Sequence, residues 1–463
     1  MLRRFSVYLW VVGVFVASEA LARYLGIRFA SETLGTLYQY LDPTVLREDL
    51  ARGLYDLHAQ PPLFNFFLGV VVKMFPETDG AVFSALYGAM ALGTLFGMAW
   101  LMRRFQIPDV VSGAVCLLFA LSPSFPVYRN WLFYTLPVAF LLVASAVALT
   151  VYSEKSSRPA LVTFSGLILA IMMTRSVFHP LWLVLAAAAL VPFVHERLER
   201  KRFLLACAIP FLMTNLLFLK NYALVGSYSG STWLGLSLAK RWPLSQREVA
   251  ELKSRGKLPE FWQRRPFQEP DYYQRFGFFD NATNGLAVLD APYKSNGEPN
   301  FNHRDYVAIS DALFEADVGL IASYPGRYAR RVVTSMMLFL QPGPNSVHFL
   351  VDYDFERVHR YRDAWTQYVF LGGNVERPIR MLAPPANLWL VLFPVLLVAG
   401  ARARPRGPFV FMLVCIVWVS VVTNFIEIGE NDRMRWEVEP FLAILFAFAV
   451  SRMLLFLRRL KRA

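Results

Sequence analysis

Asp56-Leu57-His58-Ala59-Gln60-Pro61-Pro62-Leu63-Phe64-Asn65 is the stretch from which the fold and function of this chain are best inferred. It places a carboxylate, an imidazole, an amide and a rigid Pro-Pro step just ahead of an apolar run that continues to residue 75. The stretch closes the first long polar segment, residues 26–62, which follows the first apolar segment. So many polar groups beside apolar segments indicate an active site at a membrane surface.

The composition is that of a membrane protein with many spans. Of the 463 residues, 56% are hydrophobic and only 17% are charged, whereas a soluble domain carries about 25% charged residues. Cys116, Cys207 and Cys415 all fall within apolar runs, so they predict neither a disulfide framework nor a thiolate metal site. The first apolar run has no clear small-x-small cleavage site, and we expect it to be an uncleaved first span.

The predicted fold is an all-α polytopic membrane protein with about ten transmembrane helices. A span needs about 20 apolar residues. Ten segments reach or approach this length: 6–25, 80–102, 109–125, 131–152, 159–174, 177–194, 203–219, 385–401, 408–426 and 438–457.

Basic residues set the expected orientation. Ten spans put all of the following clusters on one side: Arg3 and Arg4; Arg103 and Arg104; Lys155 and Arg158; Arg197, Arg200, Lys201 and Arg202; Arg402, Arg404 and Arg406; and Arg458, Arg459, Lys461 and Arg462. The positive-inside rule makes that side cytoplasmic, with both termini there. The net charge of +13 is then a consequence of topology and does not indicate a nucleic-acid partner.

The polar segments divide the chain into three parts. Residues 1–219 form a membrane module with spans one to seven and an outer loop, 26–79. Residues 220–384 form a large, nearly neutral extracytoplasmic region, and residues 385–463 carry the last three spans. The apolar run 63–75 is too short to span, so we expect an interfacial helix on the outer surface, with a short buried span as the alternative. Residues 329–341 predict an amphipathic helix that docks on the membrane or on the spans.

Several cations fall on the outer side, against the orientation bias. They are Arg129, Arg175, Lys220, Arg433 and Arg435. A single Arg at a span end usually reaches toward lipid head groups, and this alternative applies to Arg129 and Arg175. Cations that converge from different loops instead predict an anion site, and the natural anion at a membrane is a lipid phosphate.

Three carboxylates of the first outer loop are candidates for a general base: Glu32, Asp42 and Asp56. Asp42 precedes Pro43, and the commoner use of Asp-Pro is to cap the next helix. Asp56 could simply pair with Arg52, four residues earlier.

The stretch 56–63 resembles the Asp-x-His-Pro-Pro-Leu motif of protein O-mannosyltransferases, which belong to the GT-C superfamily of membrane glycosyltransferases. Lipid A aminoarabinose transferases share the layout of a cytoplasmic N-terminus, a catalytic first outer loop and many spans, as in glycosyltransferase family 39. The segment from Glu427 or Glu430 to Pro440 is a weaker match to the entry of a late span. Ala59-Gln60 is inserted between the histidine and the prolines, and the Asp-Glu pair that opens the family's first loop is absent.

The resemblance implies transfer of a sugar from a polyprenyl-phosphate donor to an acceptor hydroxyl on a glycan, lipid or protein. A first-loop carboxylate would be the base, and its position relative to the first span favours Asp42 over Glu32 and Asp56. Departing phosphate would bind Lys220, Arg175, Arg433 and Arg435, while His58 and Gln60 orient the donor or the base.

Fixed cations require no cofactor in this reaction, although a divalent metal is possible. We expect an integral protein of a bacterial inner or plasma membrane, with an extracytoplasmic site. The alternative function is a transporter or flippase of lipid-linked sugars, which predicts ionisable residues within spans and an internal repeat.

Overall fold

The computed structural model describes residues 2–194, 196–279, 285–341, 343–344, 350, 353–369, 388–403 and 406–460. Within these residues the secondary structure is helical apart from two isolated bridges, one of which pairs Ala30 with Trp131. The predicted all-α fold is therefore confirmed for the part of the chain that the structure describes.

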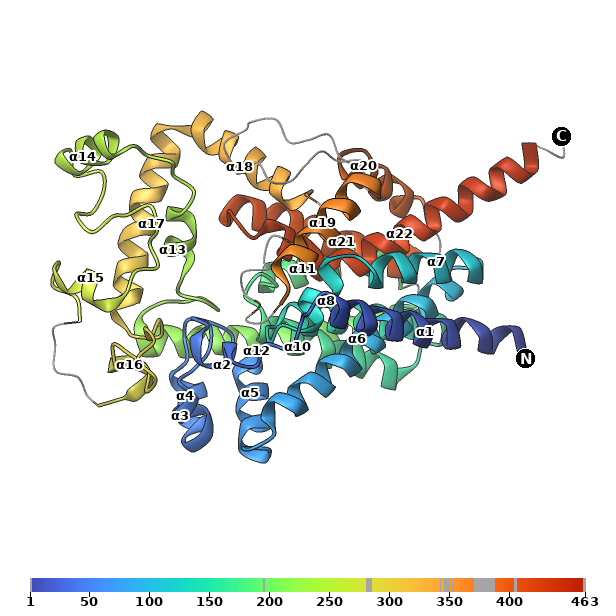
Figure 1. The fold of residues 1–463 in the computed structure, drawn as a ribbon, viewed down its shortest axis with the longest axis horizontal. Coiled ribbons are helices and arrows are strands. Elements are labelled where there is room, and N and C mark those ends of the chain that lie inside the picture. Colours follow the sequence, from blue (N-terminus) through green and yellow to red (C-terminus); the bar gives the residue numbers. More distant parts are fainter. Residues whose placement is uncertain are drawn as a thin grey trace.

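The first half of the chain forms a bundle with short surface helices inserted between its long ones (Figure 1). In order, the helices are α1 (Leu2–Tyr24), α2 (Thr33–Thr36), α3 (Pro43–Glu48), α4 (Leu50–Asp56), α5 (Leu63–Met74), α6 (Asp79–Arg104), α7 (Asp109–Ala120), α8 (Ser124–Arg129), α9 (Thr135–Lys155), α10 (Arg158–Thr174), α11 (Pro180–Leu190), the 3-10 turn η1 (Val191–Phe193) and α12 (Arg197–Val225).

The second half adds a lobe and then completes the bundle. Its helices are α13 (Leu234–Ala239), α14 (Gln246–Ser254), α15 (Pro270–Gln274), α16 (Ala287–Asp290), α17 (Asp305–Ser323), α18 (Pro325–Phe339), α19 (Phe355–Tyr368), α20 (Leu388–Ala401), α21 (Arg406–Ile426) and α22 (Asn431–Leu460).

Six helices among the described residues are long and apolar enough to cross a membrane: α1, α6, α9, α12, α21 and α22. These support an integral membrane protein. Three further predicted spans, 109–125, 159–174 and 177–194, correspond to shorter apolar helices, α7, α10 and the α11–η1 segment. The remaining one, 385–401, begins outside the described residues. The count of ten spans stays a prediction.

α9 is the central helix of the bundle. It packs against α6, α10, α21 and α22. Of the residues in its 18-residue apolar segment, 72% are buried inside the protein. α12 lies at the edge of the bundle, against α10 and α11. Only 33% of the residues in its 18-residue apolar segment are buried. α12 therefore presents most of its apolar surface outward, as a helix facing lipid would.

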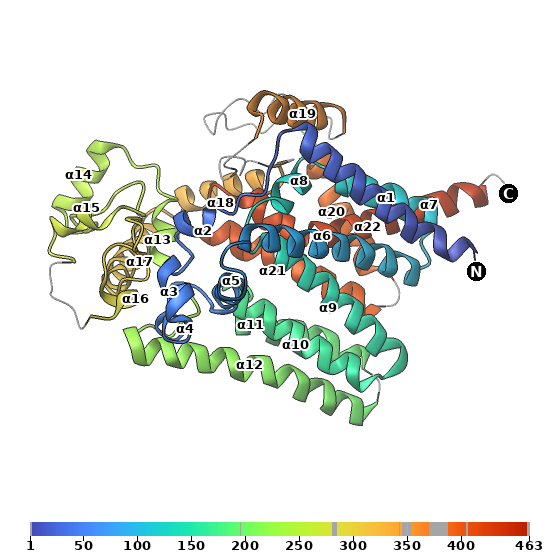
Figure 2. The ribbon, with the colours of Figure 1, turned by 60° about the horizontal axis from the view of Figure 1, so that its bottom comes forward.

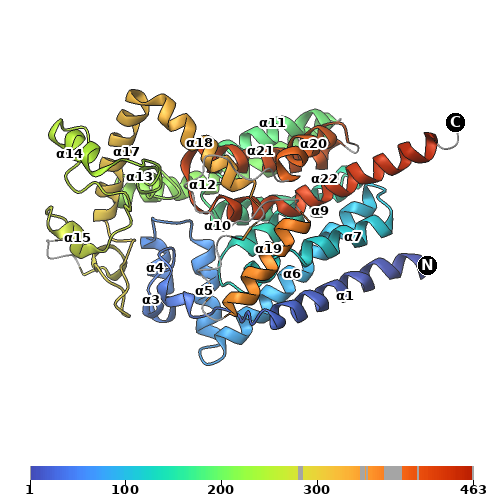
Figure 3. The same ribbon diagram turned by 45° about the horizontal axis from the view of Figure 1, so that its top comes forward.

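Both ends of the chain lie at one end of the bundle. α1 begins and α22 ends at the right of the molecule in Figures 1 and 2, and the lobe of α13–α17 lies at the opposite end. α19 lies across the far end of α1 (Figure 3), where Arg357 Nη1 donates to the carbonyl of Tyr24 over 3.0 Å. The C-terminus of α1 and the N-terminus of α22 consequently face the lobe.

The lobe has its own hydrophobic core, built on Trp233, Trp242, Phe301, Tyr306 and Leu313. α12 runs past the boundary predicted at residue 219 and ends at Val225; the next residue, Gly226, has a φ of 76°, which glycine readily adopts. Part of the predicted region 220–384 therefore packs around a hydrophobic core of its own, whereas the bounds and the extracytoplasmic placement of the region stay predictions. From this unit, α18 packs on α21 and α22, so the amphipathic helix predicted at 329–341 docks on the candidate spans.

The stretch 56–65 connects the two cores. Leu57 and Phe64 lie in the core of the bundle, whereas Ala59 lies in the core of the lobe. The helix predicted after the Pro-Pro step is α5, which buries Phe64, Leu68 and Val72. Its placement at a membrane interface stays a prediction.

Candidate functional site

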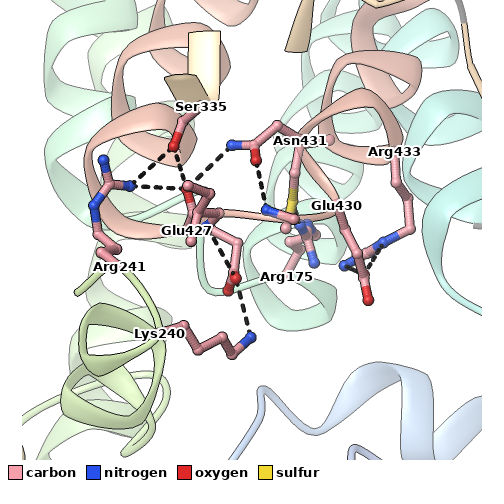
Figure 4. A network of polar contacts seen from close by, with 11 residues as sticks. Arg175, Lys240, Arg241, Ser335, Glu427, Glu430, Asn431 and Arg433 are labelled. Carbon is pink, nitrogen blue, oxygen red and sulfur yellow. Dashed lines mark hydrogen bonds and ion pairs between the residues drawn. The ribbon is translucent and has the colours of Figure 1, made fainter. Parts of the chain in front are cut away.

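A network of charged side chains surrounds the junction of α21 and α22, at the lobe-facing end of the bundle (Figure 4). We call this set the α22 network: Arg175, Lys240, Arg241, Glu427, Glu430, Arg433 and Glu437. Asn431 holds the turn between the two helices, since its side chain donates to the carbonyl of Glu427 over 3.1 Å and accepts from Gly429 N over 3.0 Å. The predicted polar stretch before the last span thus becomes a tight turn and the first turns of α22.

Two arginines of the network form ion pairs, and one of the pairs is fully buried. Arg175, at the C-terminal end of α10, places Nε 2.8 Å from an oxygen of Glu437, and both side chains are buried. Arg433 places Nη2 2.8 Å from Glu430, whose side chain keeps 34% of its surface exposed. The buried guanidinium group of Arg433 is therefore paired with a partly exposed carboxylate.

Aromatic rings face both guanidinium groups. Arg175 lies 4.8 Å from the ring centre of Tyr134, and Arg433 lies 5.0 Å from that of Phe133. Burial strengthens such contacts because water no longer competes for the cation. Nη1 of Arg433 is buried without a hydrogen-bond partner among the described residues. Arg433 therefore has an unused hydrogen-bond donor at a buried, positively charged position.

Lys240 and Arg241 reach the same turn from the end of α13. Lys240 Nζ lies 3.0 Å from Glu427 Oε1, and Arg241 Nη1 donates to the backbone carbonyl of Glu427 over 2.9 Å. Ser335 of α18 donates to that carbonyl as well, over 3.1 Å. Burial lowers the pKa of Arg241 to about 10, which still leaves it cationic at neutral pH. The lobe is thereby attached to the α21–α22 turn through charged contacts.

The first loop contacts the α22 network through two chains of rings. Tyr38 stacks on Phe267, with ring centres 6.2 Å apart, and Lys240 lies 4.9 Å from the centre of Phe267. Tyr40 lies 6.2 Å from Phe133, which faces Arg433. These contacts place Tyr38 and Tyr40 next to rings that face the cations; a shared site with the first-loop carboxylates stays a prediction.

Two further predicted cations of the outer face, Arg129 and Arg435, pair elsewhere. Arg129 places Nε 3.0 Å from Glu19 of α1, and it is buried. Arg435 donates to the carbonyls of Phe339 and Gln341 and lies 3.3 Å from Glu439. These contacts tie helices together. Neither Arg129 nor Arg175 extends outward as a head-group anchor would.

The three predicted bases occupy different environments. Asp42 caps α3, since its Oδ1 accepts from Thr44 N over 2.8 Å, and it also accepts from the backbone and hydroxyl of Ser295. Glu32 is exposed at the start of α2. Asp56 is buried and lies 2.7 Å from Arg52 Nε. The cap at Asp42 and the pair at Asp56, both considered as alternatives, are confirmed; a catalytic role for any of the three stays a prediction.

His58 links the stretch 56–65 to the lobe. Its Nε2 lies 2.7 Å from the carbonyl of Asn302 and its Nδ1 lies 3.0 Å from the hydroxyl of Thr232. The carbonyl can only accept, so Nε2 carries the proton and Nδ1 accepts from Thr232. Burial lowers the pKa of His58 to about 4, which makes the ring neutral. Gln60 is only half-buried.

Lys220 lies beside the same stretch, where Nζ donates to the carbonyls of Tyr55 and Leu57. Lys220 therefore groups with Asp56 and His58, whereas Arg175 and Arg433 belong to the α22 network. The predicted residues form two sets, one at the base of the lobe and one at the α21–α22 turn.

In the part of the chain that the structure describes, no group of three or more His, Cys, Asp and Glu side chains is placed to hold a metal ion. Glu437 and Tyr38 were not among the predicted site residues. Glu437 was quoted only as part of a polar stretch, and its burial beside Arg175 depends on the pairing of α10 with α22, which local sequence does not reveal.

No protein-family model matches this chain, and no curated protein matches it. Among solved structures, it is similar to the archaeal oligosaccharyltransferase AglB from Archaeoglobus fulgidus, in complex with an inhibitory peptide and a dolichol-phosphate, with a TM-score of 0.41 and 14% identity. The match covers 98% of this chain and 52% of the other, so this chain spans about half the length of that protein.

Proposed function

We propose that this protein is an integral membrane glycosyltransferase that moves a sugar from a polyprenyl-phosphate donor to an acceptor hydroxyl at the extracytoplasmic face. The observation that carries the proposal is the environment of Arg433. Glu430 forms an ion pair with its Nη2, and the ring of Phe133 faces its guanidinium group. Its Nη1 is buried and has no hydrogen-bond partner among the described residues. A phosphate oxygen would satisfy that donor.

The surrounding charges suit a phosphate leaving group. When the glycosidic bond breaks, the phosphate gains negative charge, and fixed cations in a dry site stabilise it without reorganising. Arg433 would contact the phosphate, while Arg175 and Lys240 contribute positive potential from α10 and from the lobe. Each of the latter two is paired with a carboxylate, which holds the cation in place.

A carboxylate must also take the proton of the acceptor hydroxyl. Asp42 follows Tyr38 and Tyr40, the first-loop residues that contact the rings beside the cations, but its oxygens already accept hydrogen bonds from Thr44 and Ser295. Glu430 is partly exposed and adjoins Arg433. We therefore retain Asp42, Glu32 and Asp56 as candidates and add Glu430.

Transfer of a labelled sugar from polyprenyl phosphate, measured in membranes that contain the protein, tests the cation site. Arg433→Gln should lower transfer about 10²–10³-fold, because one fixed donor to the developing charge is lost. Arg360→Gln on α19 is the matched control, since it breaks an exposed Arg–Glu pair, with Glu356, that is not part of the network. Full transfer by a well-expressed Arg433→Gln variant would exclude the α22 network as the donor site.

Four amide variants identify the base: Asp42→Asn, Glu32→Gln, Asp56→Asn and Glu430→Gln. The correct one should lose about 10²–10⁴-fold in rate, with donor binding retained. If all four keep full activity at normal expression, the base has been assigned wrongly. A flippase would instead move the labelled lipid across the bilayer without forming a new glycosidic bond, so analysis of the product separates the two functions.

A further inference from the structure

A pocket of about 290 Å³ lies between the first-loop helices α3 and α4 and the segment 285–288 that leads into α16. Its charged lining residues are Glu48, Asp49, Arg52 and Asp56. The pocket does not include any residue of the α22 network. We propose that it binds a small organic ligand that carries a protonated amine.

The first observation is an unsatisfied carboxylate oxygen. Asp56 keeps only 2% of its side-chain surface exposed, and its Oδ2 lies 2.7 Å from Arg52 Nε. Its Oδ1 is buried and has no hydrogen-bond partner in the described chain. A buried acceptor without a partner has a free-energy cost, because it has lost its hydrogen bonds to water. A ligand that lies in this pocket and donates a hydrogen bond to Asp56 would recover that energy.

The second observation is the charge of the lining. Glu48 and Asp49 are exposed side chains of the lining, and Asp49 also interacts electrostatically with Arg52. Asp49 stands at the N-cap position of α4 without using its side chain as a cap. Three carboxylates therefore share the pocket with one guanidinium, that of Arg52, whose side chain is 49% exposed.

Lys220 also acts on Asp56 electrostatically. It does not line the pocket, however, and its Nζ is already bound to the carbonyls of Tyr55 and Leu57. The lining side chains thus offer mainly acceptors and net negative charge. An ammonium group supplies both of the missing properties, because it has three donors and a positive charge.

The size of the pocket limits the ligand. Small-molecule sites in proteins usually measure about 300–1,000 Å³, so this pocket takes a molecule at the small end of that range. One amine would meet the buried carboxylate of Asp56, and a second would meet the exposed Glu48 or Asp49 of the same lining. A short diamine offers both cations on a small carbon chain.

Calorimetric titration of the purified full-length protein with putrescine tests the proposal. Butane-1,4-diol is the matched neutral probe, since hydroxyls replace the two amines on the same carbon chain, and glucose represents a neutral sugar. We expect putrescine to bind at least about tenfold more tightly than either neutral probe, as loss of a charge-assisted hydrogen bond predicts. Equal binding of the three probes, or no binding of putrescine at concentrations on the order of 10 mM, would overturn it.

Asp56→Asn should weaken putrescine binding at least about tenfold. Glu251→Gln on α14 is the control, because it also breaks an Arg–carboxylate pair spaced by four residues, between Arg255 and Glu251. If Asp56→Asn does not fold, the double variant Glu48→Gln/Asp49→Asn alters only exposed side chains and should weaken binding in the same direction. Unchanged binding by the folded variant would contradict the proposal. This readout is independent of sugar transfer, so it stands or fails apart from the proposed function.

Discussion

His58 couples its own ionisation to folding. In the folded protein the ring is buried and neutral, with a pKa of about 4, whereas an exposed histidine has a pKa near 6.5. Between these two values the unfolded chain binds a proton that the folded chain does not. Folding thus lowers the pKa of His58. Its contribution to the free energy of unfolding is complete above pH 6.5 and is lost as the pH falls toward 4.

The free energy of unfolding should therefore fall by up to about 1.4 kcal/mol per pH unit through this window because of His58 alone. Chemical denaturation in detergent at several pH values would measure the slope. The slope should be smaller in His58→Gln, which cannot titrate, and that variant should also be less stable at pH 7 by about 1–3 kcal/mol, as Thr232 and Asn302 lose a partner. Equal slopes in both proteins would contradict a neutral, buried His58.

The pair of Arg175 and Glu437 should respond differently to single and double substitution. Glu437→Gln leaves Arg175 buried without its counter-charge, and breaking a buried pair in this way costs about 3–5 kcal/mol. The double variant Arg175→Met/Glu437→Gln removes both charges and should recover much of that loss. Thermal unfolding of the wild type, Arg175→Met, Glu437→Gln and the double variant measures the coupling. Additive losses would show that the two side chains do not depend on each other.

At the level of residues, sequence predicts local contacts and misses distant ones. The cap formed by Asp42 follows from Asp-Pro chemistry, and the pair of Arg52 and Asp56 follows from a spacing of four residues. His58 instead meets Thr232 and Asn302, which are 174 and 244 residues away in the chain. No local pattern encodes those contacts, so the structural role of His58 could not be predicted from its motif.

The contact between α13 and α17 depends on a glycine. A Cβ atom at Gly235 would overlap the backbone carbonyl oxygen of Ser310, and neither backbone can move aside without separating the helices. Gly235→Ala should therefore destabilise the lobe by several kcal/mol, beyond the about 1–3 kcal/mol typical of overpacking.

Gly319→Ala on α17 is the matched control. Nothing lies within 4 Å of the added Cβ there, and alanine favours a helix over glycine by up to about 1 kcal/mol. Hydrogen exchange of the lobe amides would separate the two variants. Faster exchange in Gly319→Ala than in Gly235→Ala would show that the α13–α17 contact has been misjudged.

At the level of helices, apolar length predicts most elements but not their ends. The segments 80–102 and 203–219 correspond to the longer helices α6 and α12, since polar residues continue a helix beyond its apolar part. The segment 438–457 lies inside α22, which begins at Asn431 because the charged residues of its first turns are paired with Arg175, Glu430 and other partners. The sequence placed those charges before the helix, as charges at the outer face usually are.

At the scale of the whole molecule, the protein consists of two cores that meet at charged and hydrogen-bonded contacts. Leu57 and Ala59 belong to different cores although only His58 separates them. Lys240 and Arg241 form the second connection, at the α21–α22 turn. A change in the position of the lobe would therefore alter contacts both at the stretch 56–65 and at the α22 network. The proposed donor site thus includes residues of the bundle and of the lobe.

The number of spans is the remaining property of the whole molecule that the sequence predicts and that labelling can decide. α10 has 17 residues, about 25 Å at 1.5 Å per residue, against a hydrocarbon core of about 30 Å. Lys155→Cys, His179→Cys and Ser254→Cys place exposed thiols at the two ends of α10 and on the lobe. The native cysteines are buried and should give little background.

With ten spans, an impermeant maleimide should label the thiols at 179 and 254 in intact cells, and the thiol at 155 only after the membrane is opened. The short α10 would then cross by thinning the bilayer or by packing against α9 and α12, which cover its sides. Labelling of residues 155 and 179 from the same side would show that α10 does not cross. The outer placement of Arg175 would then be wrong, and with it the extracytoplasmic position of the α22 network.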